Sequence, residues 1–335
     1  MNSYFMGEDG FSWFIGVVED RADPKKAGRV RVRCLGYHTA KTEDIPTEDL
    51  PWASIMMPVT AGGNSGIGVS SHFLLEGTWV VGFFRDPAKQ EPVIMGALPG
   101  VNTKETTNFT VAASSKQGGK SKEGGFRDPK GVYPTDLYLG KPDTNLLAQE
   151  SPSTHPSRDK KDADQEWSTA SGSASQPKTT QANAKYPYNH VYETESGHYV
   201  EFDDTAGNER IHLYHKMGTF IEIDSAGNVI IKTVGNVTNI VAGNMDTYVK
   251  GNYSVSAGGN IDIYAGKGLT EKVDGNVKIT VAKNVESAIT GSLTEEVTMD
   301  VKQDYKVNLT TTIGALGSIK ASAAMVVGGS SISFN

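Results

Sequence analysis

Apolar and polar residues alternate along most of the chain, and the pattern between residues 11 and 100 predicts short strands. Its apolar runs are "WFIGVV", "GRVRVRCLG", "ASIMMPV", "GTWVVGFF" and "PVIMGAL", separated by the turn-forming stretches "DPKKAG", "GGNSGIG" and "DPAKQEP". Five short strands within about 90 residues predict a small barrel of the OB type, with a domain over residues 1–100. The segment "RVRVR" places Arg29, Arg31 and Arg33 on one strand face, which we expect to be solvated or to form a charged docking surface.

Residues 101–185 lose this organisation. The stretches "SSKQGGKSKEGG" and "SRDKKDADQEWSTASGSASQPKTTQANA" are rich in Ser, Lys, Thr, Gly and Gln and lack the apolar residues of a core. They predict a polar, extended linker. Within it, residues 124–148 hold enough apolar side chains to dock as a strap.

Strand patterns return over residues 186–234. The stretch "HYVEFDDTAGNERIHLYHKMGTFIEIDSAGNVIIKTVGN" predicts three or four strands joined by the turns "TAGN", "KMGT" and "SAGN". We expect these strands to lead into the element that follows.

An eight-residue repeat occupies the chain from residue 235, with repeats that begin at 235, 243, 251, 259, 267, 275, 283 and 291. A chain that turns a corner every eight residues would suit a positive φ, which glycine adopts without strain. Glycine fills the first position of six of these octads, and Lys267 and Lys283 fill it in the other two. The predicted structural corners are Gly235, Gly243, Gly251, Gly259, Gly275 and Gly291.

The third and seventh positions of each octad are apolar throughout, while the even positions are mainly polar. This alternation predicts strands, because apolar residues spaced four and eight apart drift around a helix. The residues predicted to face a central axis are Val237, Val241, Met245, Val249, Tyr253, Ile261, Val273, Val277, Val281, Ile289 and Val297.

Geometry then limits how an octad can be used. Eight residues at about 3.3 Å each give a path of at most roughly 26 Å, too short for a closed coil with inward side chains. An octad is therefore better placed as one side of a three-sided prism. Three identical chains that each supply every third side would close the shaft. The predicted fold is all-β: an OB barrel, an extended linker and, over residues 235–335, an intertwined triple-stranded β-helix of a homotrimer. After Val297 we expect the octad to lapse into a tapering tip that is capped by another chain or otherwise covered, with an aggregation-prone tail as the alternative.

Composition and charge narrow the classes of function. The 335-residue chain has a formal net charge of −7, which offers no basic surface for nucleic acid. Cys34, the single cysteine, lies in a predicted strand and is expected to be a buried hydrophobe and no nucleophile. The sequence shows neither a secretion signal nor an apolar run of about 20 residues, so we expect assembly in a cytoplasm.

Candidate chemistry is sparse. "GGNSGIG" from Gly62 lacks the spacing of a phosphate loop, so a barrel loop is expected. His198, His212 and His215 could hold a metal only by joining across three chains, and ordinary surface histidines are expected instead. We predict no catalytic residue, metal or cofactor.

Several long stretches resemble a known family. "WFIGVVEDRADPKKAGRVRVRCLGYH", "IPTEDLPWASIMMPVT", "SGIGVS" and "EGTWVVGFF" resemble the N-terminal OB domain of the cell-puncturing central spike of T-even-type phage baseplates. "YPYNHVYETESGHYVEFDDTAGNERIHLYHKMGTFIEID" resembles the start of the trimeric β-helix of that spike. The octads resemble its shaft, which is shared in outline with the valine-glycine repeat spikes of type VI secretion.

The resemblance implies a structural, membrane-piercing protein of the virion tail baseplate, assembled in the bacterial host cytoplasm. The OB domains of a homotrimer would seat on a trimeric hub, and a small tip protein would cap the C-terminal end. Sheath contraction would then drive the spike through the host outer membrane.

The resemblance also has a departure, since spikes of the T-even type carry a lysozyme domain between barrel and shaft. Here that interval is the polar linker, where Glu123, Glu150 and Glu166 lack the packed surroundings that raise the pKa of a catalytic acid. We therefore predict that the chain is not an enzyme. Two alternatives remain: a spike-borne enzyme, either a cell-wall hydrolase or a receptor-degrading tailspike, and an adhesin on a β-helical stalk.

Overall fold

The computed structural model describes residues 12–71, 73–100, 142–149, 166–170, 172–175 and 183–329. The chain forms two compact units, Met1–Ile261 and Asp262–Asn335. Within the described ranges the regular structure consists of strands and short 3-10 helices, which confirms the predicted all-β class. None of the helices in those ranges has the length and hydropathy needed to span a bilayer.

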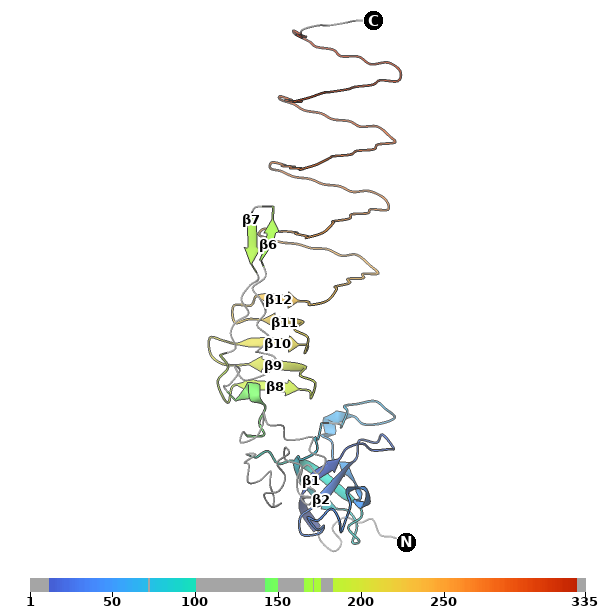
Figure 1. The fold of residues 1–335 in the computed structure, drawn as a ribbon, viewed down its shortest axis with the longest axis vertical. Coiled ribbons are helices and arrows are strands. Elements are labelled where there is room, and N and C mark those ends of the chain that lie inside the picture. Colours follow the sequence, from blue (N-terminus) through green and yellow to red (C-terminus); the bar gives the residue numbers. More distant parts are fainter. Residues whose placement is uncertain are drawn as a thin grey trace. The chain divides into compact units, whose positions relative to one another are not determined.

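The N-terminal strands close into a barrel with the order β1-β2-β3-β5-β4. Figure 1 labels β1 and β2 of this barrel. Strand β1 pairs with both β2 and β4, and β3 pairs in parallel with β5, whereas the remaining pairs are antiparallel. This arrangement confirms the predicted OB-type barrel. Its elements are β1 (Ser12–Asp20), β2 (Val30–Cys34), η1 (Thr47–Asp49), β3 (Trp52–Ile55), η2 (Val59–Ala61), β4 (Trp79–Phe84) and β5 (Pro92–Ala97).

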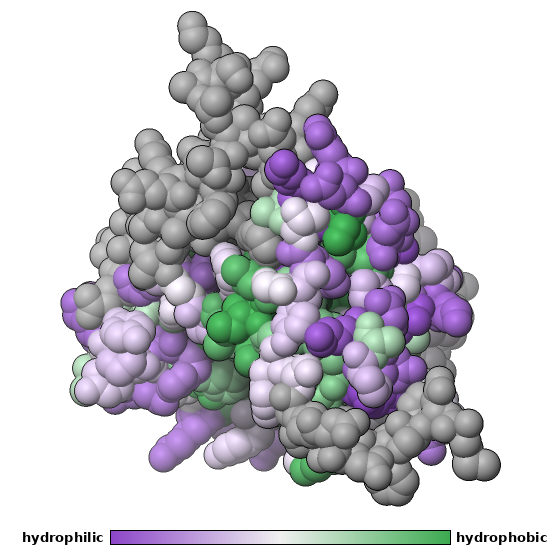
Figure 2. Space-filling model, turned by 90° about the horizontal axis from the view of Figure 1, so that it is seen from below, coloured by the Kyte–Doolittle hydropathy of each residue, from purple (hydrophilic) through white to green (hydrophobic). Residues whose placement is uncertain are grey.

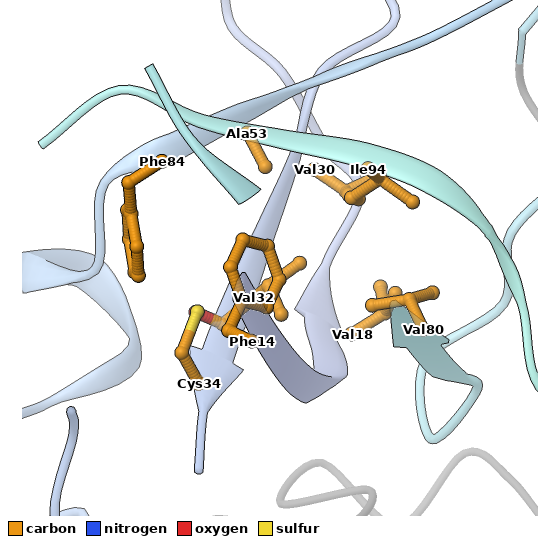
Figure 3. Close-up of a cluster of buried hydrophobic side chains, with 9 residues drawn as sticks. All are labelled: Phe14, Val18, Val30, Val32, Cys34, Ala53, Val80, Phe84 and Ile94. Atoms are coloured by element: carbon orange, nitrogen blue, oxygen red, sulfur yellow. The ribbon is translucent and has the colours of Figure 1, made fainter. Parts of the chain in front are cut away.

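The barrel encloses one apolar core, because alternate residues of each strand point inward. Cys34 is fully buried there, and burial raises the pKa of its thiol to about 12, so it packs as an unreactive hydrophobe. At Gly82 a Cβ would meet the carbonyl oxygen of Val93 and the ring of Phe14, which explains the glycine. Figure 3 shows the core residues Phe14, Val18, Val30, Val32, Cys34, Ala53, Val80, Phe84 and Ile94.

The prediction of a solvated or docking arginine face on β2 is wrong. Arg33 is fully buried, where its guanidinium binds the carboxylate of Glu19 at 2.5 and 3.0 Å and donates to two backbone carbonyl oxygens. The Arg29 guanidinium binds Asp23, and that of Arg31 lies 4.6 Å from the ring centroid of Trp52. All three guanidinium groups therefore bind partners within the barrel domain, because loop segments cover this face of the strand.

Apolar side chains also remain on the outside of the barrel. Trp13 and Ile15 of β1 are 52% and 47% exposed, and Met95 of β5 is 41% exposed. Figure 2 shows a surface patch of hydrophobic residues surrounded by hydrophilic ones.

Little of the predicted linker lies within the described residues. The helix η3 (Leu146–Ala148) begins after Asn145, whose side chain accepts a hydrogen bond from the backbone N–H of Leu147. Strands β6 (Glu166–Thr169) and β7 (Gly172–Ser175) form a hairpin. Of the predicted strap 124–148, residues 124–141 lie outside the described ranges, as do Glu123 and Glu150.

Five antiparallel strands follow. Four of them, β9–β12, lie in the stretch from His198 for which three or four strands were predicted, and β8 precedes that stretch. They are ordered β12-β11-β10-β9-β8, so each strand pairs with its neighbours in the sequence (Figure 1). The connecting turns contain Gly197, Gly207, Gly218 and Gly227, all with positive φ. The strands are β8 (Asn189–Glu193), β9 (Tyr199–Asp203), β10 (Arg210–Tyr214), β11 (Phe220–Ile223) and β12 (Val229–Lys232).

The octad region has a bend every eight residues, from residues 234–235 through 322–323. The prediction that the octad lapses after Val297 is therefore wrong, since bends continue at residues 298–299, 306–307, 314–315 and 322–323. The predicted positive φ is also wrong, because no glycine of an octad corner has one. The corners use backbone conformations open to any residue, so Lys267, Lys283, Met299 and Val307 occupy the same slot.

Candidate functional site

The sheet of strands β8–β12 presents an exposed face of apolar side chains. Across the paired strands, Ile211 lies opposite Phe202 and Ile223, and Leu213 lies opposite Val200 and Ile221. Leu213 is 52% exposed and Phe202 is 50% exposed. A contiguous patch of this kind marks an interaction surface in a soluble protein. We call the following residues the apolar face: Tyr192, Val200, Phe202, Ile211, Leu213, Ile221, Ile223, Val229 and Ile231.

The opposite face of the same sheet is polar and yet buried. Arg210 donates a hydrogen bond of 2.7 Å to Glu201, and a second nitrogen of its guanidinium lies 3.9 Å from Glu222. The His212 ring lies between these carboxylates, with Nδ1 at 3.6 Å from Glu201 and 4.0 Å from Glu222. Cross-strand pairing brings opposite charges together, so the network compensates the burial of its charges.

The helix η3 packs against this polar face. Leu147 is fully buried against Tyr199, Tyr214 and Phe220. The side-chain amide of Asn189 donates to the carbonyl oxygen of Leu147 at 2.9 Å and to the Glu201 carboxylate at 2.8 Å. The described end of the strap therefore docks on the sheet through both an apolar cluster and a buried hydrogen bond.

The octads present a second exposed apolar surface. The residues predicted to face the axis range from 43% exposed at Val249 to 74% exposed at Val237. Past the last of them, Val301, Tyr305, Leu309 and Ile313 continue the third and seventh positions and are at least 51% exposed. Among the residues that the structure describes, these columns remain exposed.

The histidines do not gather into a metal site. His212 is buried in the polar network, whereas the rings of His198 and His215 lie beside each other with centroids 4.4 Å apart. In both rings Nδ1 accepts a backbone N–H, from Lys216 and Met217 respectively. Within the described residues, no group of acidic, histidine or cysteine side chains could hold one.

Sequence reasoning missed the ionic network of the sheet. The alternation was visible in "HYVEFDD", "ERIHLYH" and "FIEID", but alternation alone does not say which face is buried. The usual expectation of apolar residues inside is reversed in the single chain. The available signal was the cross-strand pairing of polar residues, since Arg210 lies opposite Asp203 and His212 lies opposite both Glu201 and Glu222.

Part of the chain matches a known protein family. Residues 36–195, which include β3–β5, η3 and the start of the sheet β8–β12, match the family described as the Gp5 N-terminal OB domain. The chain is therefore similar to the Gp5 proteins over this range, and the predicted resemblance to central spikes of T-even-type baseplates is confirmed.

Two similar proteins have Gp5 in their names. The chain is 40% identical over 270 residues to "Protein Gp5" of Vibrio phage KVP40, an alignment that covers 71% of this chain and 61% of that protein. It is 39% identical over 149 residues to the "Pre-baseplate central spike protein Gp5" of Enterobacteria phage T4, covering 43% of this chain and 23% of that protein. The chain thus spans less than two thirds of the length of either relative.

Proposed function

We propose that the chain is the structural central spike of a contractile phage tail baseplate, and that it works as a homotrimer. One observation carries this proposal: the apolar face of the β8–β12 sheet and the octad columns are exposed in succession along the same chain. Two successive surfaces of this kind require a partner along their whole length. The printed name of the T4 relative, a pre-baseplate central spike protein, supports the location.

The octads support an intertwined triple-stranded β-helix. A bend every eight residues gives straight segments of equal length, and up to Ile313 each segment carries two apolar side chains, at its third and seventh positions. In a trimer, three such segments would form one layer, with the third and seventh positions meeting at the axis. Because the bends continue to residues 322–323, we propose that the shaft extends to that point.

The role is mechanical. The barrel would seat on a trimeric hub of the baseplate, the C-terminal end would take a small capping protein, and contraction would drive the shaft through the host outer membrane. No catalytic step is needed for this role. The described part of the linker consists of residues 142–149, which include η3, and of the β6–β7 hairpin.

The enzyme alternative has a direct test. Purified protein incubated with peptidoglycan should release no soluble fragments, while a muramidase assayed in parallel should clear the suspension. Measurable lysis by the purified chain would contradict a purely structural spike.

The trimer itself is tested by a charge placed on the apolar face. Leu213→Asp would bring three carboxylates into a desolvated interface, so we expect the trimer to dissociate. Met217→Asp is the matched control, because Met217 is also apolar and 59% exposed but lies in the turn after β10. Light scattering should report one chain for Leu213→Asp and three for Met217→Asp. Trimers in both variants would refute the assignment of the face.

A further inference from the structure

The segment between β3 and β4 is unusual in being both exposed and uncharged. We call the described residues of this segment, 56–71 and 73, the arm. Between Leu50 and Leu75 the sequence has 26 consecutive residues without Asp, Glu, Lys or Arg, in a chain that is 21% charged. Residues 62–70 of the arm are nevertheless all exposed. Protein surfaces that stay in water normally carry charge, whereas the centres of interfaces are depleted of it.

The backbone of the arm is held by hydrogen bonds in a tight turn. Asn64 and Ile67 exchange backbone hydrogen bonds of 3.1 and 2.9 Å around Ser65 and Gly66, whose φ values are 51° and 82°. Positive φ at both central residues defines the tight turn that suits a hairpin. The backbone N–H of Val69 then donates to Ala61, which fixes the two sides of the arm to each other.

This ordered hairpin holds apolar side chains in the open. Val59 is fully exposed, Ile67 is 77% exposed and Val69 is 64% exposed. A fixed backbone that presents apolar side chains without any charged neighbour on the segment is the pattern of a protein contact.

The end of the arm is continuous with the apolar face. The ring of Phe73 packs edge-on against that of Tyr192, with centroids 4.8 Å apart. Tyr192 belongs to the apolar face, where copies of the chain meet in the proposed trimer. The uncharged surface therefore runs from the sheet through Phe73 onto the arm.

We propose that the arm packs against a second copy of this chain and so extends the subunit interface from the sheet onto the barrel. The proposal rests on the trimer of the proposed function. It commits to a second copy because the arm continues the face at which copies meet. Packing of the arm against a baseplate partner, or against another segment of the same chain, would contradict the proposal.

Thiol labelling of the full-length protein tests the proposal. Cys34 is buried and unreactive, so a cysteine introduced by Ile67→Cys can be followed alone. In the purified trimer it should react at least about tenfold more slowly than the cysteine of Lys41→Cys, an exposed control on the barrel. After denaturation the two should react at equal rates. Equal rates in the native trimer would overturn the proposal and leave the arm free for another protein.

Photo-crosslinking in the same protein identifies which chain packs against the arm. A benzophenone-bearing amino acid placed at position 67 should, on irradiation, join two chains into a band that survives boiling in detergent. Crosslinks confined to a single chain would overturn the proposal, even if labelling is slow. If only the proposal for the arm is wrong, the purified protein still has the mass of a trimer. If the proposed function is wrong, the protein has the mass of a single chain before any labelling.

Discussion

Asn189 of strand β8 donates a hydrogen bond of 2.9 Å to the carbonyl oxygen of Leu147, which lies 42 residues earlier in the chain. The contact is buried, and Leu147 itself is fully enclosed by Tyr199, Tyr214 and Phe220. A segment that begins in a polar linker is thereby fixed to the sheet that leads into the octads.

The docking of Leu147 predicts a local loss of stability when its side chain is shortened. Leu147→Ala should lower the free energy of unfolding by about 2–5 kcal/mol, because it removes buried contacts and leaves a cavity. Leu98→Ala, at a site 40% exposed, is the control and should cost much less. Denaturant unfolding gives both values, and equal small losses would mean that η3 is not a structural part of the sheet.

The Asp23 carboxylate predicts a dependence of barrel stability on pH. Its hydrogen bonds from the Arg29 guanidinium, and from the N–H groups of Lys25, Ala27 and Arg29, hold its pKa well below the usual range. A carboxyl whose pKa is lower in the folded state stabilises the fold above its unfolded pKa of about 4. That stabilisation is lost as the pH falls toward the folded pKa.

Asp23→Asn should therefore lower the unfolding midpoint near pH 7, and the deficit should shrink steadily as the pH falls below about 4. Unfolding measured over this range tests the sign, with Asp44→Asn as an exposed control that should show little difference. A deficit that is constant with pH would mean that the charge of Asp23 contributes nothing.

The absence of positive φ at the octad corners predicts that their glycines tolerate a side chain. At Gly243 a Cβ would meet no atom of its own chain within 4 Å, so Gly243→Ala should change stability by less than about 0.5 kcal/mol. Gly82→Ala, in the barrel, should cost about 1–3 kcal/mol, because its Cβ would meet Val93 and Phe14. A loss of trimers in Gly243→Ala would show that a neighbouring chain approaches this corner closely.

The period of eight predicts which deletions the shaft accepts. Removing Gly243–Lys250, one whole octad, should preserve the register of the bends and of the apolar columns, and shorten the shaft. Removing only four of these residues should place the following bends out of step and abolish detergent-resistant trimers. Electron microscopy and unboiled gels report length and assembly, and equal damage from the two deletions would contradict the repeat.

The barrel could be predicted from the sequence because each of its strands has its own apolar run between turn residues. Arg33 could not be placed in this way. Its alternation with Val32 and Cys34 puts it on the outer face, but the burial of that face depends on how the loop after β2 folds back over the strand. Local patterning describes the two faces of a strand and does not report what covers them.

The octads show the same limit. Their period and apolar columns were plain in the sequence, yet the reason given for the glycines was wrong, because the bends need no positive φ. The end of the repeat was also misplaced. Glycine was used to recognise the first position of each octad, but Met299 and Val307 occupy that position in the later octads. The two sides of the β8–β12 sheet were visible as alternation, but the burial of Glu201 and Arg210 required the docked η3 and the paired charges.

The mass of the purified full-length chain in solution tests the central claim most directly. Sedimentation equilibrium should give three times the 35.9 kDa of one chain, because the apolar face and the octad columns have no cover within a single copy. A folded, compact species of one-chain mass would contradict the account.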